Sequence, residues 1–520
     1  MGFLSIVVLQ DILYFRGFVV GTKDNVLIVG RMDSQYAMSI GVRDAVSFGP
    51  TLIVNGKAAK YSGNSGGLNP RTAIGQRADG AVLLLVIEGR KTSSMGATMA
   101  DLIDVMQEYG AVNAANLDGG MSSAMWYNNE ELVSSSSIIF SSVSGTVLKV
   151  DTVVEASGYK KPAVYITVEG DEWEESIDRS DKLVTLADKP ELTPEEIIEK
   201  VKNAGIVGMG GACFPTHVKL MPPPQFKPEW VIINAVECEP YLTADHRLML
   251  EKADEVLVGV ELLMKAAKVT KGFIGIEENK PDAIKLMTEK CAAQHPNIEV
   301  VPLKTKYPQG GEKQLVDAVV RRQVPAPPAL PVSVGAIIQN VGTAFAVYEA
   351  VMKNKPLFER IVTVTGKELK QPSNFLTRMG TPMTQLIEAC GGLPDGEVKV
   401  IGGGPMMGKA LVNTDVPICK GSSGVLIMSG EDVRRGEPQP CIRCAKCVSA
   451  CPMGLEPYLL ATCSDKKMWD KVEAEDITSC IECGSCQFTC PSKRPLLDLI
   501  RLGKTTVMTN IRARQMAAQK

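Results

Sequence analysis

Two cysteine runs near the C-terminus constrain this chain more than any other feature. Both read C-x2-C-x2-C-x3-C-P, the first over residues 441–452 and the second over residues 480–491. Gaps of two residues let three thiolates wrap one corner of an iron–sulfur cubane, and the fourth cysteine ligates the other cluster of a pair. The doubled run therefore predicts two [4Fe–4S] clusters. The ligand sets are Cys441, Cys444, Cys447 and Cys490 for one cluster, and Cys480, Cys483, Cys486 and Cys451 for the other.

Zinc knuckles and disulfides are the alternative interpretations of such runs. Zinc sites more often have two C-x2-C pairs, or combine cysteine with histidine, and this chain has only 3 histidines. Cysteine occurs 14 times in all, and the residues outside the runs are scattered. Scattered cysteines beside a cluster motif indicate a reducing compartment, which predicts a cytoplasmic location.

Length and composition set the broad class. A chain of 520 residues is long enough for several domains, and its formal net charge of -3 gives no indication of nucleic-acid binding. No apolar stretch approaches the roughly 18 residues of a membrane span. Residues 1–8 are apolar but lack a basic flank, and Asp11 soon interrupts the apolar run, so no signal peptide is predicted.

Residues 1–138 are predicted to form a unit of their own. Residues 81–88 are nearly all apolar, which predicts a buried strand. Residues 97–109 have apolar side chains at helical spacing and precede Gly110, which predicts a helix that ends there.

A glycine turn at residues 116–124 contains Asp118. Together with residues 69–75, this turn resembles the phosphodiester glycosidase family, over roughly residues 40–130. The resemblance implies that Asp118 acts as a general acid or base, or binds a metal. It also implies that Arg71 and Thr72 hold a phosphate. The alternative is that Asp118 only caps a turn.

Residues 139–192 are predicted to be a connecting segment. After a serine run, residues 141–147 resemble one hairpin of a lipoyl- or biotinyl-like barrel, without a lysine at the tip that could be lipoylated. The acidic residues 170–175 predict an exposed connection. The composition shift near residue 140 suggests a junction between two fused parts.

Residues 193–357 alternate apolar strands with helical patterns. The first helix has a capping box at Thr193, with proline at its first position. Such alternation predicts a parallel α/β sheet of Rossmann-like kind. The expected strands are residues 230–236, 272–276, 298–303 and 335–338, and the expected helices are residues 254–267, 281–292, 312–322 and 343–352.

The remainder of the chain is predicted to form two small domains and a tail. Residues 358–430 combine strand and helix patterns in a smaller mixed domain, residues 431–500 hold the cysteine runs, and residues 501–520 form a C-terminal tail. The proline-rich segment 324–331 can be neither helix nor central strand, so it is expected to be a rigid surface connection.

A glycine loop and three further turns predict one cofactor cavity. Gly208, Gly210 and Gly211 let the backbone approach a flat ring or a phosphate without Cβ clashes. The loop follows a helix rather than a strand, so it is no ordinary dinucleotide fingerprint. Residues 234–240, 307–312 and 339–343 each lie at or just past the end of a predicted strand, where parallel sheets place binding residues.

These four segments resemble the flavin- and NADH-binding fold of the NADH-binding subunit of respiratory complex I. Combined with the small domain and the two cysteine runs, they resemble the family of the C subunit of the Rnf electron-transport complex, over about residues 140–516. The resemblance implies a multidomain α/β fold. Its parts would be a remnant barrel-sandwich hairpin, a Rossmann-like FMN/NADH domain, a β-grasp-like (SLBB) domain and a helical two-cluster ferredoxin-like domain. The glycosidase-like segment takes the place of the strands that would complete the barrel.

The resemblance also implies roles for individual residues. Glu239 and Glu312 would meet the nicotinamide side and act in catalysis, and Phe214 would stack on the adenine of NADH. The alternatives are that Phe214 packs in the core and that Lys219 is a solvated surface lysine rather than a phosphate ligand. The implied cofactor-binding residues are Gly208, Gly210, Gly211, Phe214, Lys219, Asn234, Glu237, Gly310, Gln339, Asn340 and Thr343.

The predicted function is electron transfer in the order NADH, FMN, cluster, cluster, partner, in either direction. The cofactors carry the chemistry and the protein positions them. The resemblance implies that the partners are the other subunits of a complex that couples electron transfer between ferredoxin and NAD to Na⁺ or H⁺ movement, with this chain peripheral at the cytoplasmic face of the membrane. The alternatives are a soluble NADH-linked iron–sulfur flavoprotein, a two-cluster electron carrier without flavin, and a carbohydrate-processing enzyme in residues 1–138.

Overall fold

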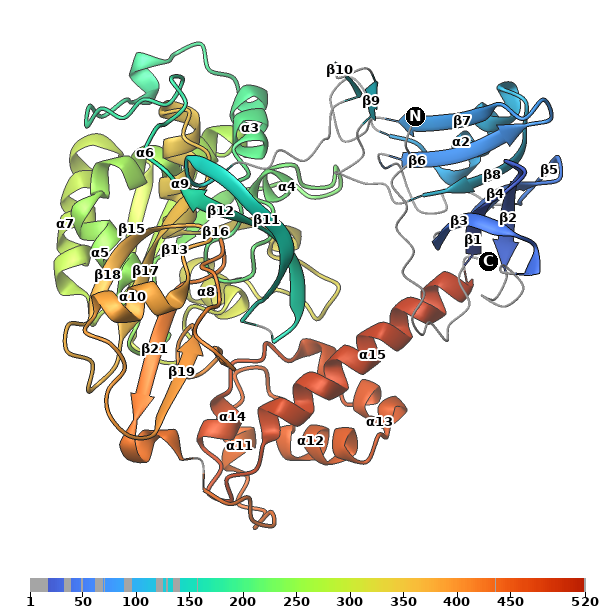
Figure 1. Ribbon diagram of the computed structural model, residues 1–520. Coiled ribbons are helices and arrows are strands. Elements are labelled where there is room, and N and C mark those ends of the chain that lie inside the picture. The colour runs from blue at the N-terminus through green and yellow to red at the C-terminus, as the bar shows by residue number, and fades with distance from the viewer. Residues whose placement is uncertain are drawn as a thin grey trace. The chain divides into compact units, whose positions relative to one another are not determined.

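The chain divides into two compact units in this computed structural model (Figure 1). One unit comprises Met1–Ile139 and Gln515–Lys520, and the other comprises Phe140–Arg514. The structure describes residues 17–31, 39–47, 50–60, 69, 71–87, 96–117, 125–127, 130–133, 141–156, 158–434 and 436–518.

The first unit is built mainly from antiparallel strands. A three-stranded sheet has the order β2-β1-β3, and a five-stranded sheet has the order β5-β4-β8-β6-β7. Leu52, Leu102 and Met106 form its core, between the larger sheet and helix α2. The elements are β1 (Gly17–Thr22), β2 (Leu27–Arg31), β3 (Val42–Ser47), β4 (Thr51–Val54), β5 (Lys57–Ala58), β6 (Arg71–Arg77), β7 (Val82–Ile87), α2 (Met99–Glu108), β8 (Ala111–Asn116), β9 (Met125–Tyr127) and β10 (Glu130–Val133).

The strand predicted at residues 81–88 exists as β7, but the prediction that it is buried was wrong. Within the described part of this unit, β7 is an edge strand that pairs with β6 alone. Val82 and Leu84 therefore point to solvent, although they are apolar. Composition alone could not tell an edge strand from a central one.

The second unit begins with a long antiparallel hairpin and a tethered connection. The hairpin pairs β11 (Gly145–Val154) with β12 (Lys160–Val168). The connection that follows is held at Trp173, whose ring meets Phe358 edge-on with centroids 5.1 Å apart. Lys353 Nζ lies 2.8 Å from an Asp178 oxygen. The acidic segment is exposed, as predicted, yet Trp173 and Asp178 hold this connection against Phe358 and Lys353.

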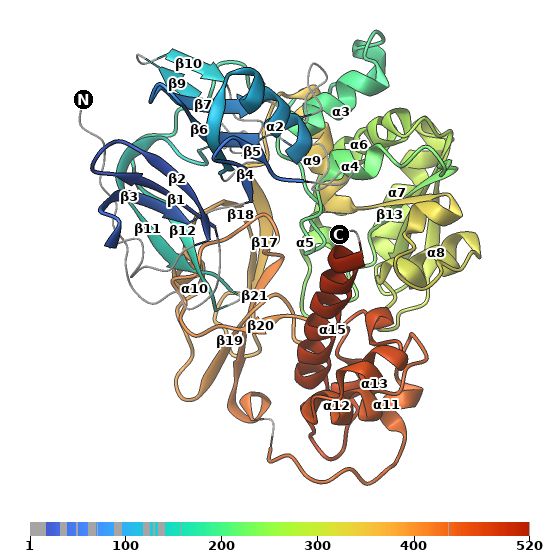
Figure 2. The same ribbon diagram turned by 90° about the vertical axis from the view of Figure 1, so that its right-hand side faces the viewer.

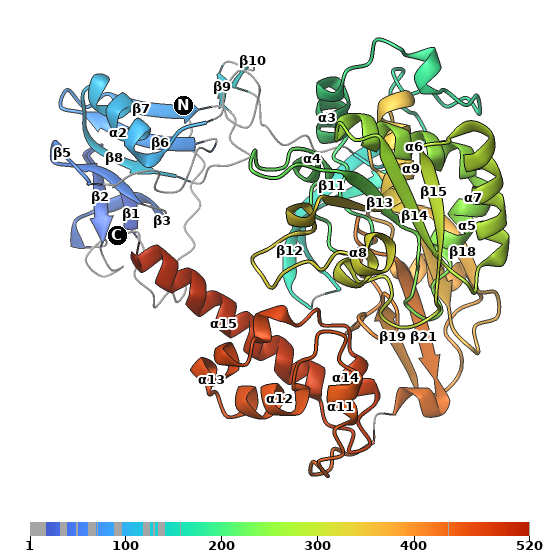
Figure 3. The ribbon, with the colours of Figure 1, turned by 180° about the vertical axis from the view of Figure 1, so that it is seen from behind.

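A four-stranded parallel sheet forms the centre of the second unit (Figure 3). Its order is β15-β14-β13-β16. Alternate residues of β13 face opposite sides, so Val231 and Ile233 pack with α6 and α9 while Ile232 packs with α8. The elements are η1 (Leu186–Asp188), α3 (Pro194–Asn203), α4 (Thr216–Leu220), β13 (Trp230–Asn234), α5 (Ala244–Glu251), α6 (Ala253–Ala266), β14 (Lys271–Glu277), α7 (Pro281–Gln294), β15 (Ile298–Leu303), α8 (Glu312–Val320), η2 (Pro331–Val334), β16 (Ala336–Asn340) and α9 (Val341–Met352).

A mixed five-stranded sheet follows (Figure 2). Its order is β18-β17-β21-β19-β20, with β17 and β21 parallel and the other pairs antiparallel. The core of this domain includes Val362, Val364 and Ile387. The elements are β17 (Glu359–Thr365), β18 (Ser373–Arg378), α10 (Met383–Ala389), β19 (Val398–Gly402), β20 (Lys409–Ala410) and β21 (Gly424–Ser429).

The cysteine runs lie in a domain of short helices packed along one long helix (Figure 1). Within the described ranges, no helix is both long enough and apolar enough to cross a membrane. The elements are η3 (Gly430–Val433), α11 (Lys446–Ser449), α12 (Pro457–Asp465), α13 (Trp469–Ala474), η4 (Ile477–Ser479), α14 (Ser485–Phe488) and the long helix α15 (Leu496–Ala518).

Candidate functional site

The glycine loop is closed by its own backbone and anchored to α9. Gly208 N donates to Phe214 O at 2.8 Å, and Met209 N donates to the Thr343 hydroxyl at 2.9 Å. Gly211 has φ +106°, which favours glycine, whereas a Cβ at Gly208 or Gly210 would meet protein atoms no nearer than 3.6 Å. Packing within the protein therefore does not require glycine at 208 and 210. A Cβ at Gly211 would meet nothing within 4 Å, so the space beside that residue is open, as a flat cofactor would need.

Phe214 and Lys219 lie at the exposed side of this loop. Phe214 is 46% exposed, so the alternative that it packs in the core does not hold. Lys219 Nζ lies 2.8 Å from Glu312 Oε1 and 3.1 Å from Ile338 O. Lys219 is therefore no free surface lysine, and the structure joins it to Glu312, a residue predicted for the other end of the site.

Two asparagines end neighbouring strands and hold adjoining turns. Asn234 and Asn340 pair in register at the ends of β13 and β16. Asn234 Nδ2 donates to Gly310 O at 2.8 Å. Asn340 Nδ2 donates to Asp245 Oδ2 at 2.7 Å, and its Oδ1 accepts from Gly342 N, capping α9. The strand ends, the turn at Gly310 and the start of α9 are thus bound to one another.

Gln339 is a buried polar residue of β16 whose side-chain amide has no hydrogen-bond partner among the described residues. Its side chain is 1% exposed, and neither its amide nitrogen nor its amide oxygen has a hydrogen-bond partner among the described residues. A buried amide without partners is costly. A flavin, whose ring edge offers donors and acceptors, would supply the missing partners, so this orphaned amide fits the predicted FMN.

A cavity of about 460 Å³ opens at the carboxyl ends of β13, β14 and β15. Glu237, Glu239, Lys280 and Tyr307 are among the residues that line it. The predicted residues thus fall into two groups, because the glycine loop, Lys219 and Gln339 do not line this cavity.

The Glu237 carboxylate is engaged by the protein itself. Its two oxygens accept from Asp245 N at 2.8 Å and His246 N at 3.0 Å, at the start of α5. Glu237 has φ +48°, a left-handed conformation that turns the carboxylate toward α5. Burial raises the pKa of Glu237 to about 8. In the structure Glu237 caps a helix, and its predicted contact with a cofactor stays a prediction.

Glu239 reaches out of the parallel-sheet domain to the five-stranded domain. Its Oε1 accepts from Met406 N at 2.8 Å and Met407 N at 2.9 Å, in a loop that begins with glycines. A Cβ at Gly404 would lie 2.0 Å from Glu239 Cγ, so only glycine fits there. Glu239 Oε2 is buried without a partner in the described part of the chain, and burial raises the pKa of this carboxyl.

Tyr307 joins the same region to the cysteine domain. Its hydroxyl donates to Cys483 O at 2.7 Å. The Met406 loop also touches that domain, because a Cβ at Gly484 would lie 2.6 Å from Met406 O. Sequence reasoning missed Tyr307, Met406 and Met407 as links between domains. The glycines at 403 and 404 were the one signal of a close approach.

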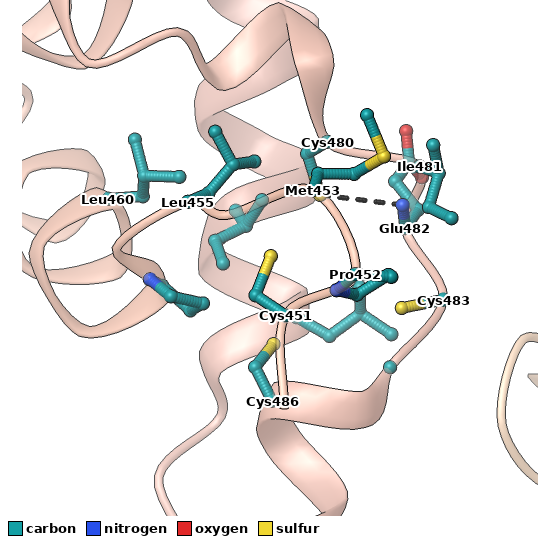
Figure 4. Close-up of a pocket in the computed structure, with 14 residues that line it drawn as sticks. Cys451, Pro452, Met453, Leu455, Leu460, Cys480, Ile481, Glu482, Cys483 and Cys486 are labelled. Atoms are coloured by element: carbon teal, nitrogen blue, oxygen red, sulfur yellow. Dashed lines mark hydrogen bonds between the residues drawn. The ribbon is translucent and has the colours of Figure 1, made fainter. Parts of the chain in front are cut away.

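The second cysteine run encloses an apolar cavity (Figure 4). Cys451 from the first run lines it together with Cys480, Cys483 and Cys486. Burial and the neighbouring thiols raise the pKa of Cys486 to about 12, so its free thiol would stay protonated until a metal displaced the proton. The remaining lining residues include Met453, Leu455, Leu460 and Ile481.

No three potential ligands in the described ranges converge as they would on a single metal ion. A cubane differs from such a site, because each of its four cysteines binds a separate iron. The donor set around the cavity, four thiols in an apolar shell, therefore fits a cluster better than a lone ion.

The first run follows the same backbone course but is more open. Arg443 (φ +57°) and Ala445 (φ +58°) correspond in position to Glu482 (φ +58°) and Gly484 (φ +80°) of the second run. Left-handed residues other than glycine are strained, and such strain gathers at ligand sites. Cys441 and Cys444 are exposed, Cys447 is buried and Cys490 is partly buried.

The glycosidase-like turn falls outside the described residues. Asp118 lies in a range that the structure does not describe. Arg71 and Thr72 lie on β6, where Arg71 Nε donates to Ala97 O at 3.1 Å and Leu117 N donates to Thr72 O at 2.8 Å. The predicted roles of these three residues stay predictions.

Three family models match parts of the chain. The Nuo51 FMN-binding domain matches residues 201–349, and the SLBB domain matches residues 361–410. The phosphodiester glycosidase family matches residues 13–150. The chain is thus a multidomain α/β protein with an FMN-binding domain of the Nuo51 type and an SLBB domain.

Curated relatives resemble the chain over most of its length. It is 45% identical over 338 residues to the C subunit of the proton-translocating ferredoxin:NAD(+) oxidoreductase complex of Clostridium ljungdahlii, covering 65% of this chain and 72% of the relative. It is 44% identical over 375 residues to the C subunit of the Na(+)-translocating ferredoxin:NAD(+) oxidoreductase complex of Acetobacterium woodii. That match covers 72% of this chain and 83% of the relative.

Solved structures are more distant. An NAD+-reducing [NiFe]-hydrogenase matches with a TM-score of 0.41 and 19% identity, over 63% of this chain and 62% of that one. A zebrafish N-acetylglucosamine-1-phosphodiester alpha-N-acetylglucosaminidase matches with a TM-score of 0.21 and 19% identity. That match covers 24% of this chain and 45% of the solved chain.

Proposed function

Because this chain belongs to the family of the C subunit of ion-translocating ferredoxin:NAD(+) oxidoreductase (Rnf) complexes, we propose that it is the subunit that exchanges electrons with NAD(H). The electrons would pass between NADH, FMN and two [4Fe–4S] clusters, and then to the other subunits of a membrane complex that couples ferredoxin and NAD to ion movement. The absence of a spanning helix in the described ranges is compatible with a peripheral subunit. We place it at the cytoplasmic face, where NADH is found.

The contact between Tyr307 and Cys483 carries this proposal. It fixes the cavity at the sheet edge against the second cysteine run, with the hydroxyl 2.7 Å from the carbonyl. Glu239 adds a second link through Met406, whose loop touches Gly484. Gly310, a proposed flavin contact, lies in the same turn as Tyr307, and a turn held this firmly against a cluster-binding region suits electron transfer, which depends on short and constant distances.

We propose that FMN is held by the glycine loop and the strand ends. Gly208, Gly210 and Gly211 would give the ring room, Lys219 would meet the phosphate, and the orphaned Gln339 amide would bond the ring. Bound FMN accepts a hydride and gives up electrons singly. The remaining proposed cofactor contacts are Asn234, Glu237, Gly310, Asn340 and Thr343, with Phe214 on the adenine of NADH and Glu239 and Glu312 on its nicotinamide side.

We propose that the two clusters occupy different environments. The inner cluster would be held by Cys451, Cys480, Cys483 and Cys486, beside the flavin region, in the apolar cavity of Figure 4. The outer cluster would be held by Cys441, Cys444, Cys447 and Cys490, nearer to solvent. The helical domain would then be ferredoxin-like, and the hairpin β11–β12 a remnant of a barrel-sandwich fold.

Substitution of Gln339 tests the flavin site directly. Gln339→Met keeps the volume and removes an amide that has no partner among the described residues, so the apoprotein should lose no stability. Its affinity for FMN should fall roughly tenfold, which titration of apoprotein with FMN would measure. Ile337→Met, at a buried position of the same strand, serves as the matched control. Equal FMN affinity in the Gln339 variant and the wild type would remove the amide from the site.

A second activity is proposed for the first unit. The glycosidase family model covers residues 13–150, so we propose cleavage of a phosphodiester glycoside there, with Asp118 as the acid or base. Release of sugar from such a substrate, lost in Asp118→Asn, would support the activity. No release by the wild-type chain would refute it without touching the electron-transfer proposal.

A further inference from the structure

The two cysteine runs follow the same backbone course, but the second run is largely covered by the chain and the first is largely exposed to solvent. In the second run, the residues between the ligands are covered by the chain itself. Glu482 pairs with Arg501 at 3.2 Å and with Lys504 at 3.0 Å. Gly484 is pressed against Met406 O. The second run is thus an interface, already occupied by Tyr307, by the Met406 loop of the five-stranded domain and by α15.

The first run offers a comparable surface to solvent. Ile442, which corresponds to the half-buried Ile481, is 67% exposed. The segment from the other run that carries Cys490 lies alongside, because Gln439 N donates to Ser492 O at 2.8 Å. That segment adds Phe488, which is 78% exposed. Two large apolar side chains therefore face solvent beside the proposed outer cluster.

Basic residues lie close to these apolar residues along the chain. Arg443, Lys446 and Lys493 are exposed, and none of them forms an ion pair with another described residue. Glu437 is the one acidic residue in residues 436–446 and 487–495. This face is basic although the whole chain has a formal net charge of -3. We call Ile442, Arg443, Lys446, Phe488 and Lys493 the outer face.

We propose that the outer face docks an electron-transfer subunit of the same complex that presents acidic residues around an apolar patch and carries its own one-electron centre. This inference rests on the proposed function. One electron would leave the outer cluster and reduce the partner's centre, or move in reverse, with no bond made or broken. Complementary charge would speed and orient the encounter. Ile442 and Phe488 would form the apolar contact from which water is excluded.

A protein partner suits this face better than a lipid surface. Basic residues with exposed apolar side chains can also bind anionic membranes. The outer face, however, is built on the loop that carries Cys441 and Cys444, the exposed ligands of the proposed outer cluster. Lipid at this position would cover the cluster with a layer that accepts no electrons.

Charge reversal on the full chain, loaded with its cofactors, tests the proposal. The test variant is Arg443→Glu/Lys446→Glu/Lys493→Glu. The matched control is Lys466→Glu/Lys467→Glu/Lys471→Glu, three exposed lysines near α12 and α13 in the same domain. The probe is the detergent-solubilised complex assembled without this chain. Two quantities are measured: the affinity of the chain for that complex without NADH, and the rate at which it reoxidises the NADH-reduced chain.

The test variant should bind at least roughly tenfold more weakly and react correspondingly more slowly at low salt, while the control stays within roughly twofold of wild type. Added salt should weaken binding of the wild-type chain to the complex, so that its affinity approaches that of the variant. Wild-type affinity in the test variant, or an equal loss in the control, would overturn the proposal. So would a variant that loses only its binding to vesicles of anionic phosphatidylglycerol.

Two further measurements keep the result interpretable. Because Arg443 and Lys446 lie between cluster ligands, iron content is compared first. If the triple variant assembles poorly, Lys493→Glu alone, which lies outside both sets of ligands, replaces it, with weaker binding than the control as the expected result. Failure of NADH to bleach the wild-type flavin would refute the proposed function, whereas the binding measurement would still decide on the outer face.

Discussion

The Tyr307 hydroxyl donates a hydrogen bond of 2.7 Å to the backbone carbonyl of Cys483. Tyr307 belongs to a turn between β15 and α8, and Cys483 to the second cysteine run. The bond therefore joins the turn that carries Gly310, a proposed flavin contact, to the second cysteine run, across 176 residues of sequence.

Removing that hydroxyl should slow electron transfer without affecting the flavin. Tyr307→Phe keeps the ring and loses a hydrogen bond worth about 1 kcal/mol. Reduction of the clusters by NADH should slow several-fold, while the flavin is bleached at the wild-type rate, both followed by stopped-flow absorbance. A wild-type rate of cluster reduction in the variant would show that the bond does not set the geometry of transfer.

A single cysteine substitution should remove one cluster. Cys486→Ala deletes a proposed thiolate ligand of the inner cluster, so the iron content should fall by about half. Cys463→Ala is the control, because Cys463 is a buried free thiol of the same domain core outside both runs. Full iron content in Cys486→Ala would refute the ligand assignment.

Loss of Glu312 should impair reaction with NADH while FMN stays bound. The carboxylate lies at the start of α8, 2.8 Å from Lys219 Nζ. Without it, Lys219 loses its ion pair but remains available to a phosphate. NADH oxidation by Glu312→Ala should fall at least roughly tenfold, as expected for loss of a charged contact. Glu229→Ala, which breaks a surface ion pair with Arg322, should keep full activity. Full activity in Glu312→Ala would exclude Glu312 from the site.

The close approach at Gly484 offers a test of the domain interface. Alanine is tolerated in this conformation, because Ala445 occupies the corresponding position of the first run with φ +58°. A Cβ at 484, however, would lie 2.6 Å from Met406 O. Gly484→Ala should therefore open the interface and slow reduction of the clusters.

Gly454→Ala provides the control for backbone strain in that experiment. Gly454 has φ +67°, and a Cβ there would meet nothing within 4 Å. The Gly454 variant should lose some stability but keep the rate of cluster reduction. Equal rates in both variants would show that the Met406 contact is immaterial.

Much of the architecture could be predicted because it depends on local patterns. The alternation of apolar strands and helices in residues 193–357 predicted the parallel sheet, and the strand pairing confirms it. The capping box at Thr193 is present, with the Thr193 hydroxyl accepting from Glu196 N. Such signals need only neighbouring residues.

The contacts between domains could not be predicted in this way. Glu239 and Met406 are far apart in sequence, and nothing local marks either as the partner of the other. The helix-capping role of Glu237 depends on a left-handed turn that glutamate rarely adopts. β7 was expected in the interior because its composition is apolar, but sheet order decides which strand lies at the edge.

The proposed electron path can be followed in an anaerobic NADH reaction of the cofactor-loaded chain, frozen at intervals for electron paramagnetic resonance. Reduced flavin should appear first, and signals from two distinct [4Fe–4S] clusters should follow, both at rates sufficient for turnover. Clusters that stay oxidised while the flavin is fully reduced would contradict it, and so would a loaded chain that holds one cluster or none.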